Sequence, residues 1–512
     1  MNKSDLNRLS KIEDRIVQII EDDLKIEYVP IEWDVIPYQK MLEIMAYRIP
    51  TNISSWKFGR DYEKQRTIYE NLDNNIPYEV IIFSNPARAY LMNTNPFAVQ
   101  VLVMAHCFGH SAIFKMNKWF SNNRYDIMDL MFNASVRFNE YEKLYGIDKV
   151  ERTIDAGHSI QWHSSPFETE TEEERKKRVF EQKKKIARIE YSKYGDLVKS
   201  NKPIGDDEYN RRLWEKIKTT SPVEPIEDIL RYIIDNPKIL DDWQIDILET
   251  LRSEGQYYWP MIKTKTINEG FATFVHQFVM EKLFNEGLLT NDEHGQYNYS
   301  NSLVKAKRYV SLNPYHIGCG IFENIRDRWD KGRHGFEYEQ CKNKKQKEEW
   351  DTKDGKGLDK IREVIRSYTD WFFMQDFLTS ELVHELDLYI YQVVDQGNYY
   401  DYIVTDHTAE EVRQIIINSY AHSGIPKIEI LNGNYNDNGS LYMIHRFAGA
   451  PLDKGYAVET MRHICHLWGR PVILETKQDN KDIIFKVEKD DKIGFNVTHS
   501  VANPLDQNYF II

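Results

Sequence analysis

Two apolar phrases, far apart in the chain, constrain the fold more than any other feature. The first, VMAHCFGHSAIF at residues 103–114, places His106 and His110 four residues apart inside an apolar run. The second, TINEGFATFVHQF at residues 266–278, places Glu269 at the head of another apolar run. An α-helix has about 3.6 residues per turn, so residues i and i+4 lie on one face. Both imidazoles can therefore reach one ion if the first segment is helical.

These three side chains form a candidate metal site. Two imidazoles from one helix and a carboxylate from a second helix would leave the fourth position of a tetrahedral zinc ion open, as in catalytic zinc sites. Zinc is therefore the predicted cofactor, and His106, His110 and Glu269 are its predicted ligands. Buried polar groups among bulky apolar residues need partners, which a shared cation would supply. Asn268 is predicted to cap the second helix, and Gly270 to allow close packing.

Each of these residues also has a simpler interpretation. Histidines in an apolar helix are often buried and hydrogen bonded to the backbone. A glutamate at the start of a helix interacts favourably with the helix dipole, without any ligand. The sequence alone leaves both alternatives open.

Three further residues are candidates for acid–base chemistry. His276 lies seven residues after Glu269 on the same helix face, about 10 Å along the axis, where it could orient a ligand, carry a proton or simply fill the core. His316, in NPYHIG, is either a turn histidine or a residue that a loop brings to a cavity. Glu254, in LRSEGQYYWP, is either a partly buried carboxylate with a raised pKa or the end of a helix before Gly255.

The second phrase resembles the zincin aminopeptidases, in which the Glu of an NEGFA phrase binds zinc after an HExxH helix. The Glu inside HExxH is the general base of such metallopeptidases. In this chain that position is Cys107, which is either an inert buried thiol or a reactive or metal-bound one. The resemblance therefore implies the three ligands but no base, and it favours metal binding over peptidase activity.

Composition narrows the class of protein. A chain of 512 residues is expected to form two or three domains, and 41% hydrophobic residues is normal for a soluble globular protein. The net charge of −13 argues against broad binding to nucleic acid or anionic membranes. Four cysteines without paired spacing give no disulfide framework. We find no run of about 18 apolar residues, which predicts a soluble, cytoplasmic protein.

The pattern of apolar residues predicts an α+β protein. Residues 1–375 read as a large, mainly α-helical, zincin-like domain, with a charged helical insertion at 168–200. Residues 376–512 carry short strands rich in Ile, Val and Tyr and two helices, the first starting at a capping box from Thr408 to Glu411. This order predicts a small ferredoxin-like (βαββαβ) domain, with a hairpin turn at 432–440.

Most of the chain resembles the stage V sporulation protein R (SpoVR) family. The residues that carry the resemblance are HCFGH, DAGHSIQWH, LRSEGQYYWPMIKTKTINEGFATFVH, NPYHIG and GNYNDNGSLYMIHRFAGAPLDKGYAVETMRHICHLWGRPVILET. The match extends over most of the chain outside the charged 168–200 region. The chain differs from the usual sequence of the family at Phe271, where Trp is common, and in the residues around His163.

The resemblance implies a process more than a reaction. The family is associated with formation of the spore cortex, a peptidoglycan layer, and in non-sporulating bacteria it accompanies a PrkA-type serine kinase and a von Willebrand-like partner. We therefore expect a role in sporulation or stress-linked envelope remodelling. One hypothesis is a zinc-dependent hydrolase without the HExxH base, using Glu254, His276 or His316 instead. The alternative is a non-catalytic regulatory protein on a degenerate zincin scaffold, with the C-terminal domain as its docking surface.

Overall fold

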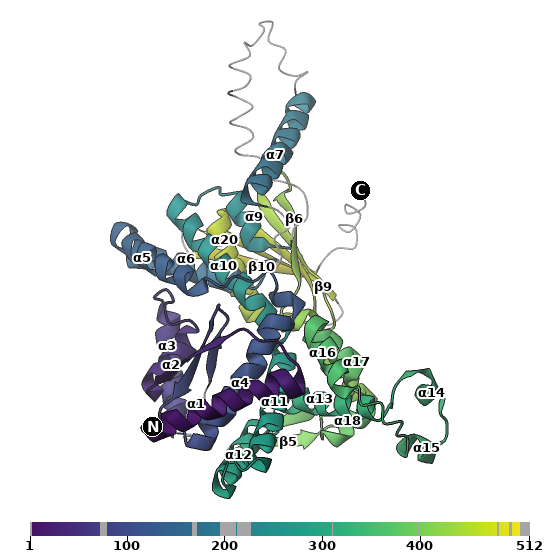
Figure 1. Ribbon diagram of the computed structural model, residues 1–512. Coiled ribbons are helices and arrows are strands. Elements are labelled where there is room, and N and C mark those ends of the chain that lie inside the picture. Colours follow the sequence, from purple (N-terminus) through teal and green to yellow (C-terminus); the bar gives the residue numbers. More distant parts are fainter. Residues whose placement is uncertain are drawn as a thin grey trace, which may run out of the picture. The chain divides into compact units, whose positions relative to one another are not determined.

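The computed structural model describes most of the chain (Figure 1), namely residues 3–71, 79–165, 171–194, 211, 227–309, 311–397, 399–478, 481–490 and 494–501. These residues form two compact units, each assembled from two separate segments. Unit 1 comprises residues 1–132 and 260–424, and unit 2 comprises residues 133–259 and 425–512. This division differs from the predicted one at residue 375, because the chain leaves unit 1 and later returns to it.

Unit 1 is mainly helical. Its elements are α1 (Lys3–Gln18), η1 (Ile19–Leu24), β1 (Ile31–Ile36), α2 (Tyr38–Tyr47), α3 (Trp56–Asn71), β2 (Val80–Ile82), β3 (Ala87–Met92), α4 (Phe97–Met116), η2 (Lys118–Phe120), α11 (Lys265–Asn285), α12 (Asn291–Val304), α13 (Pro314–Asp330), α14 (Gly335–Gln340), α15 (Lys344–Glu348), α16 (Gly357–Ser367), α17 (Asp370–Phe377), α18 (Ser380–Glu385), β4 (Tyr391–Asp395), β5 (Tyr400–Val404), α19 (Ala409–Ser419) and η3 (Ala421–Gly424). A small sheet has the order β1-β3-β2, in which β1 is parallel and β2 antiparallel to β3. Strands β4 and β5 form a separate antiparallel pair.

Helix α4 is the core helix of unit 1. It is apolar on every side, which is typical of a helix that packs on all sides, and it contacts α11, α12 and α1. Figure 1 shows α4 and α11 next to each other. Among the described helices, α4 is the one long and apolar enough to cross a membrane, but 94% of its apolar window is buried inside the protein.

Glycines allow α4, α11 and α13 to pack closely. A Cβ atom on Gly109 of α4 would lie 2.5 Å from the Cα of Ala272 on α11. A Cβ atom on Gly270 of α11 would lie 2.4 Å from the carbonyl carbon of Gly318 on α13. Such distances are far below van der Waals contact, so these backbones touch because the side chains are absent. The predicted role of Gly270 in close packing is confirmed.

The start of α11 differs from the prediction. Asn268 does not cap the helix, because α11 already begins at Lys265. The carboxylate of Asp370 accepts hydrogen bonds from the backbone N–H groups of Thr266 (2.8 Å) and Ile267 (2.9 Å). These are two of the N–H groups that lack a partner within the first turn of a helix. A residue more than 100 positions later thus provides the cap.

Unit 2 combines helices with a five-stranded sheet. Its elements are α5 (Ile127–Tyr145), α6 (Ile147–Ile160), α7 (Glu172–Tyr194), α9 (Ile229–Asp235), α10 (Asp242–Lys263), β6 (Ile428–Tyr435), β7 (Ser440–His445), α20 (Lys454–Trp468), β8 (Val472–Gln478), β9 (Lys481–Asp490) and β10 (Gly494–Val501). Helices α5 and α10 each contain a unit boundary. The strand order is β10-β9-β8-β7-β6, and only β7 and β8 are parallel to each other.

The helical and strand content agrees with the predicted α+β class, but the ferredoxin-like order is not confirmed. That order needs the strand before α19 to join the C-terminal sheet, whereas β5 pairs only with β4 among the described strands. The hairpin turn at 432–440 is confirmed, with positive φ angles at Asn436, Asp437 and Gly439. The charged segment 168–200 contains the predicted helix as α7, while residues 168–170 and 195–200 lie outside the described residues.

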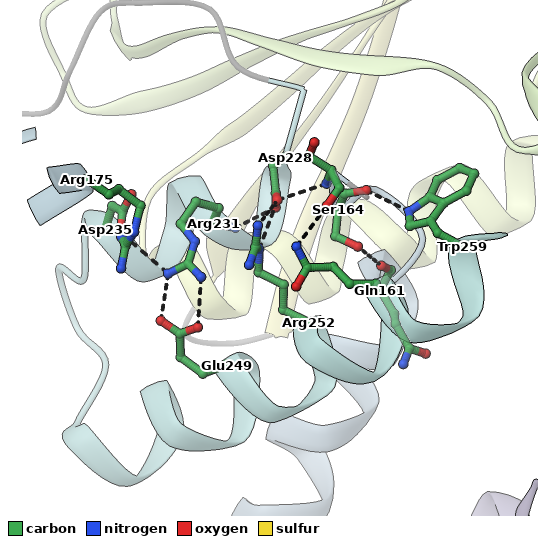
Figure 2. Close-up of polar contacts among 11 residues, drawn as sticks. Gln161, Ser164, Arg175, Asp228, Arg231, Asp235, Glu249, Arg252 and Trp259 are labelled. Atoms are coloured by element: carbon green, nitrogen blue, oxygen red, sulfur yellow. Dashed lines mark hydrogen bonds and ion pairs between the residues drawn. The ribbon is translucent and has the colours of Figure 1, made fainter. Parts of the chain in front are cut away.

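A buried polar network holds the helices of unit 2 together (Figure 2). Asp228 accepts hydrogen bonds from the backbone N–H groups of Arg231 (2.8 Å) and Ser165 (2.9 Å) and from Nε of Arg252 (2.9 Å). Its ion pair with Arg252 is almost fully buried, with side chains 4% and 5% exposed. One carboxylate thereby caps α9 and joins it to α10 and to the loop after α6.

Candidate metal centre

Four side chains from three segments of unit 1 converge on one point. His106 and His110 come from one face of α4, Glu269 comes from the second turn of α11, and Glu79 immediately precedes β2. One ligand atom from each residue lies within 4.8 Å of the other three. The structure therefore brings together the three predicted ligands and adds a second carboxylate.

The distances among these atoms are close to those around a single ion. Oε1 of Glu79 lies 3.0 Å from Nε2 of His106 and 3.5 Å from Nε2 of His110. Oε2 of Glu269 lies 3.6 Å and 3.5 Å from the same two nitrogens. Zinc bonds of about 2.0–2.2 Å place tetrahedral ligands about 3.3–3.6 Å apart. Three of the four distances fall in this range and the fourth, at 3.0 Å, is slightly shorter, so the spacing is compatible with one small cation.

The outer nitrogens of both imidazoles are held so that Nε2 faces this point. Nδ1 of His110 donates to Oδ1 of Asn268 (2.7 Å), since an amide oxygen can only accept. Nε2 of His276 likewise donates to Oδ1 of Asn301 (3.0 Å), which leaves the Nδ1 of a neutral His276 as an acceptor for Nδ1–H of His106 (2.9 Å). In the neutral form that can bind a metal ion, both ligand candidates therefore carry their proton on Nδ1 and direct a lone pair on Nε2 inward. Partners of this kind orient the histidine ligands of metal sites.

Two of the converging atoms lack hydrogen bonds. Nε2 of His106 and Oε2 of Glu269 are buried, and neither has a hydrogen-bond partner among the described residues. Leaving a buried polar atom unsatisfied costs about 1–3 kcal/mol. With neutral imidazoles, the two carboxylates carry two negative charges, which a divalent cation would neutralise.

The pKa values of the cluster reflect its burial and its opposed charges. Burial disfavours the charged carboxylate of Glu79, but the charges and polar contacts of His106 and His110 together outweigh burial and lower the pKa of Glu79. Burial also disfavours the imidazolium of His106, yet the charges of Glu79 and Glu269 and their polar contacts with Nε2 raise its pKa to about 9. Without a metal ion, Nε2 of His106 therefore carries a proton at neutral pH, and a bound cation would replace that proton. Burial, assisted by the charge of His106, lowers the pKa of His276 to about 3. His276 is therefore neutral, as its hydrogen bonds require.

Two neighbours complete the surroundings. The ring of Tyr315, on α13, stacks on His106 with centroids 5.8 Å apart, and burial raises the pKa of its hydroxyl well above the usual value. Cys107 is fully buried, and burial also raises the pKa of its thiol well above the usual value. A thiol held in its neutral form is neither a good nucleophile nor a metal ligand, so Cys107 is an inert core residue.

The donor set limits which ions fit. Imidazole nitrogens suit zinc, iron and copper, whereas carboxylates also suit manganese and magnesium. Two nitrogens and two oxygens, without a thiolate, match a divalent first-row metal ion. The residues present therefore fit a metal centre, and the donor atoms do not single out zinc.

The three predicted acid–base residues lie in different places. His276 contacts His106 from the next turns of α11. His316 belongs to the first turn of α13 rather than to a loop, and its Nε2 donates to the carbonyl of Leu386 (3.0 Å). Asn313 and Pro314, which suggest a turn in the sequence, form the start of that helix. Proline is favoured in the first turn of a helix.

Glu254 belongs to unit 2, inside α10. It is 2% exposed and accepts a hydrogen bond from Nε2 of Gln161 (2.7 Å). The predicted helix end before Gly255 is wrong, since α10 continues to Lys263. Gly255 serves close packing instead, because a Cβ atom there would lie 2.8 Å from the carbonyl oxygen of Gln161.

Sequence reasoning missed Glu79. It lies outside both helical phrases, and no helical spacing relates it to the histidines. Its one local signal is the short apolar run Val80–Phe83 that follows it.

The fold and the site define an α+β protein with a candidate centre of two histidines and two glutamates. The chain belongs to the SpoVR family: residues 3–425 match the family described as SpoVR like protein, and residues 426–479 match the SpoVR-like C-terminal domain. It is also 28% identical over 489 residues to the uncharacterized protein YcgB of Escherichia coli K12, which covers 90% of this chain and 89% of that protein. No solved structure matches the chain.

Proposed function

We propose that this protein is a cytoplasmic SpoVR protein that uses a divalent metal ion, held by His106, His110, Glu269 and Glu79, for hydrolysis in sporulation or stress-linked envelope remodelling. The convergence of these four side chains on one point carries the proposal. Membership in the SpoVR family supports the process, because the family is named for sporulation. Spore cortex or related peptidoglycan is the substrate class that this process implies.

The ion would supply Lewis-acid activation of water and of the scissile bond. His106 and His110 would hold the ion through Nε2, because His276 and Asn268 fix the orientation of the two rings. Glu269 completes three fixed ligands on two packed helices. This arrangement corresponds to a zincin-like site in which the helix supplies no HExxH base.

Glu79 is the carboxylate of the cluster that would take the role of the missing base. Its side chain is 18% exposed, and it comes from a strand end rather than from the helices that hold the other ligands. We infer that Glu79 would hold the ion in the absence of substrate and that, once substrate enters, its Oε1 would accept the proton that the attacking water loses. The buried carboxylate of Glu254 and the histidine His316 are then not needed as bases.

Metal content tests the first part of the proposal. Purified wild-type protein is expected to hold about one divalent ion per chain, and His110→Ala is expected to hold almost none. His384→Ala is the matched control, because His384 is an exposed histidine of the same unit. Equal metal content in wild type and His110→Ala would refute the metal centre.

Hydrolysis tests the second part. Wild-type protein loaded with zinc, manganese or iron is incubated with a muropeptide library, and products are identified by mass spectrometry. Cleavage that requires both His110 and Glu79 supports a hydrolase.

Metal binding without any cleavage would favour the alternative, a non-catalytic regulator on a degenerate zincin scaffold. The partners implied by the family resemblance, a PrkA-type serine kinase and a von Willebrand-like protein, would then be tested by pull-down with the full chain.

A further inference from the structure

The β4–β5 hairpin of unit 1 exposes an unusual amount of apolar surface. The two strands form a sheet that no other described strand joins. Its exposed apolar side chains include Val393 (50%), Tyr399 (66%), Tyr400 (63%), Ile403 (49%) and Val404 (50%). A two-stranded hairpin is at best marginally stable in water, and clustered exposed apolar residues mark interaction sites. The hairpin therefore has the properties of a surface that a partner covers.

The register identifies which backbone groups are available. Hydrogen bonds from Thr405 N to Ile390 O (2.9 Å) and from Gln396 N to Tyr399 O (3.0 Å) fix the paired positions of the hairpin. Pairing alternates along antiparallel strands, so the backbone groups of residues 391, 393 and 395 point away from β5. Among the described residues, no backbone hydrogen bond to these outward groups is formed.

The two edges of the hairpin are not equivalent. On the β5 edge, the outward N–H of Tyr402 donates to the side chain of Asp401 (2.9 Å), which covers part of that edge. A row of outward N–H and C=O groups is a template for another strand. The β4 edge is therefore the open one.

The side chains on one face of the hairpin extend toward this edge. The register places Val393 of β4 beside Tyr402 of β5 on one face. Tyr309 already packs on this face, with its ring 5.4 Å from that of Tyr402 and 5.3 Å from that of Tyr391. Val393 remains half exposed, so an added strand with an apolar residue at the matching position would cover it.

The negative charge of the hairpin and its flanking residues favours a basic partner. Residues 380–412 contain no lysine or arginine. Their eight acidic residues are Glu381, Glu385, Asp387, Asp395, Asp401, Asp406, Glu410 and Glu411. Of these residues, Asp387 pairs with Lys307 and Glu410 pairs with Arg413. The other acidic residues take no part in these two ion pairs, so the region keeps a strong negative charge. Two copies of this hairpin would repel each other, whereas a basic segment would be attracted.

We propose that the β4 edge binds an extended, basic segment of a partner protein, which adds to the hairpin as a third strand. Backbone hydrogen bonds to residues 391, 393 and 395 provide affinity, as in other cases of strand addition. Alternate apolar side chains of the segment pack beside Val393, and its lysines or arginines lie near Asp395 and Asp401. This surface is independent of the metal centre, so either can fail without the other.

A short fluorescent peptide that alternates lysine and valine serves as the probe. Binding to the full chain is expected to be at least about tenfold tighter than that of the same peptide with glutamate in place of lysine, and to weaken as salt is raised. Asp395→Lys is expected to weaken binding about fivefold or more by reversing a charge beside the open edge.

Two proline variants separate the edge from the hairpin. Val393→Pro removes an outward N–H from β4 without removing a β4–β5 hydrogen bond, and it is expected to abolish binding. Val404→Pro makes the same change on the β5 edge and is expected to retain binding. Unchanged hydrogen–deuterium exchange of α4 and α11 in both variants shows that unit 1 still folds.

Four results would overturn the proposal, and the first three concern peptide binding. These are equal binding of the basic and acidic peptides, equal loss of binding in Val393→Pro and Val404→Pro, or binding by Val393→Pro as tight as wild type. A wild-type dimer in sedimentation that becomes monomeric in Val393→Pro would also overturn it, because the occupant would then be a second copy of the chain.

Discussion

Both units bury a cluster of charged and polar side chains, yet the two clusters differ in how their atoms are satisfied. In unit 2, Asp228 accepts hydrogen bonds from two backbone N–H groups and from Arg252, and the neighbouring Arg231 pairs with Glu249 (Figure 2). In unit 1, Nε2 of His106 and Oε2 of Glu269 are buried without a hydrogen bond among the described residues.

The charges differ in the same way. The network of unit 2 combines three arginines with three carboxylates, namely Arg175, Arg231, Arg252, Asp228, Asp235 and Glu249. The cluster of unit 1 combines two carboxylates with two imidazoles that are each fixed with Nε2 inward. A network that pairs its arginines with carboxylates internally is a structural element. A cluster whose ligand atoms converge without such pairs can take a further group, and a cation that replaces the proton of His106 would provide both the charge and the coordination.

The largest expected effect comes from breaking the satisfied network. Asp228→Ala leaves Arg252 buried without its carboxylate, and loss of one partner of a buried ion pair costs about 3–5 kcal/mol. The amides of α9 and α10 should then exchange much faster in hydrogen–deuterium exchange. The metal content of unit 1 should not change.

Glu459→Ala is the control for this variant, because Glu459 pairs with Arg462 on the exposed face of α20. Removing an exposed pair costs about 0–1 kcal/mol. If the two variants changed exchange in unit 2 equally, the Asp228 network would not be the structural element that we describe.

The next largest effect is expected when a metal ion binds to the cluster of unit 1. A ligand that binds only the folded state, present at 100 times its Kd, stabilises by about 2.7 kcal/mol. Zinc or manganese at that concentration should therefore raise the free energy of opening of α4 and α11 in the wild type by about 2.7 kcal/mol. Hydrogen–deuterium exchange measures this as slower exchange of their amides. His110→Ala should lose this response and His384→Ala should keep it. An equal metal response in all three proteins would contradict a specific site.

His163 should make unit 2 less stable in acid. Burial, with His445 nearby, lowers the pKa of His163 in unit 2 to about 4. The unfolded chain binds a proton near pH 6.5, whereas the folded chain does so only near pH 4. The free energy of unfolding of unit 2 therefore decreases as the pH falls between these two values. The expected decrease from pH 7 to pH 5 is about 2 kcal/mol.

His163→Gln should flatten this dependence in unit 2, as measured by hydrogen–deuterium exchange at several pH values. His384→Ala is the control, because an exposed histidine of unit 1 should leave the pH dependence of unit 2 unchanged. A wild type whose unit 2 is equally stable at pH 7 and pH 5 would contradict the assignment of His163 as a buried neutral group.

Sequence signals that act within a few residues predicted the structure well. The capping box is present as predicted, with Oγ1 of Thr408 accepting from Glu411 N and the Glu411 carboxylate accepting from Thr408 N. The spacing of His106 and His110 placed both on one face of a buried helix. The glycine in NEGFA predicted close helix packing. Each of these signals depends on geometry within one helix or at one contact.

Features that depend on residues far apart in the chain were not predicted. Asn268 looks like a cap in the sequence, but Asp370 supplies the cap and Asn268 is left to orient His110. Glu79 reaches the histidines only because β2 lies in a sheet beside α4, which no local pattern encodes. The separate β4–β5 pair likewise follows from pairing choices that strand propensity does not determine.

The smallest expected effect concerns the orientation of His110 by Asn268 in the cluster of unit 1. Asn268→Ala removes the acceptor that fixes the Nδ1 proton of His110, and loss of such a partner weakens metal affinity about 10–100-fold, or about 1.4–2.7 kcal/mol. Asn268→Asp keeps an acceptor oxygen and should retain the affinity. Asn298→Ala, an exposed amide of the same unit, is the control in a competition assay with a metal-sensitive dye. If Asn268→Ala bound metal as tightly as the control, orientation of His110 by Asn268 would not matter, and the contrast between the two clusters would then depend only on the four converging side chains.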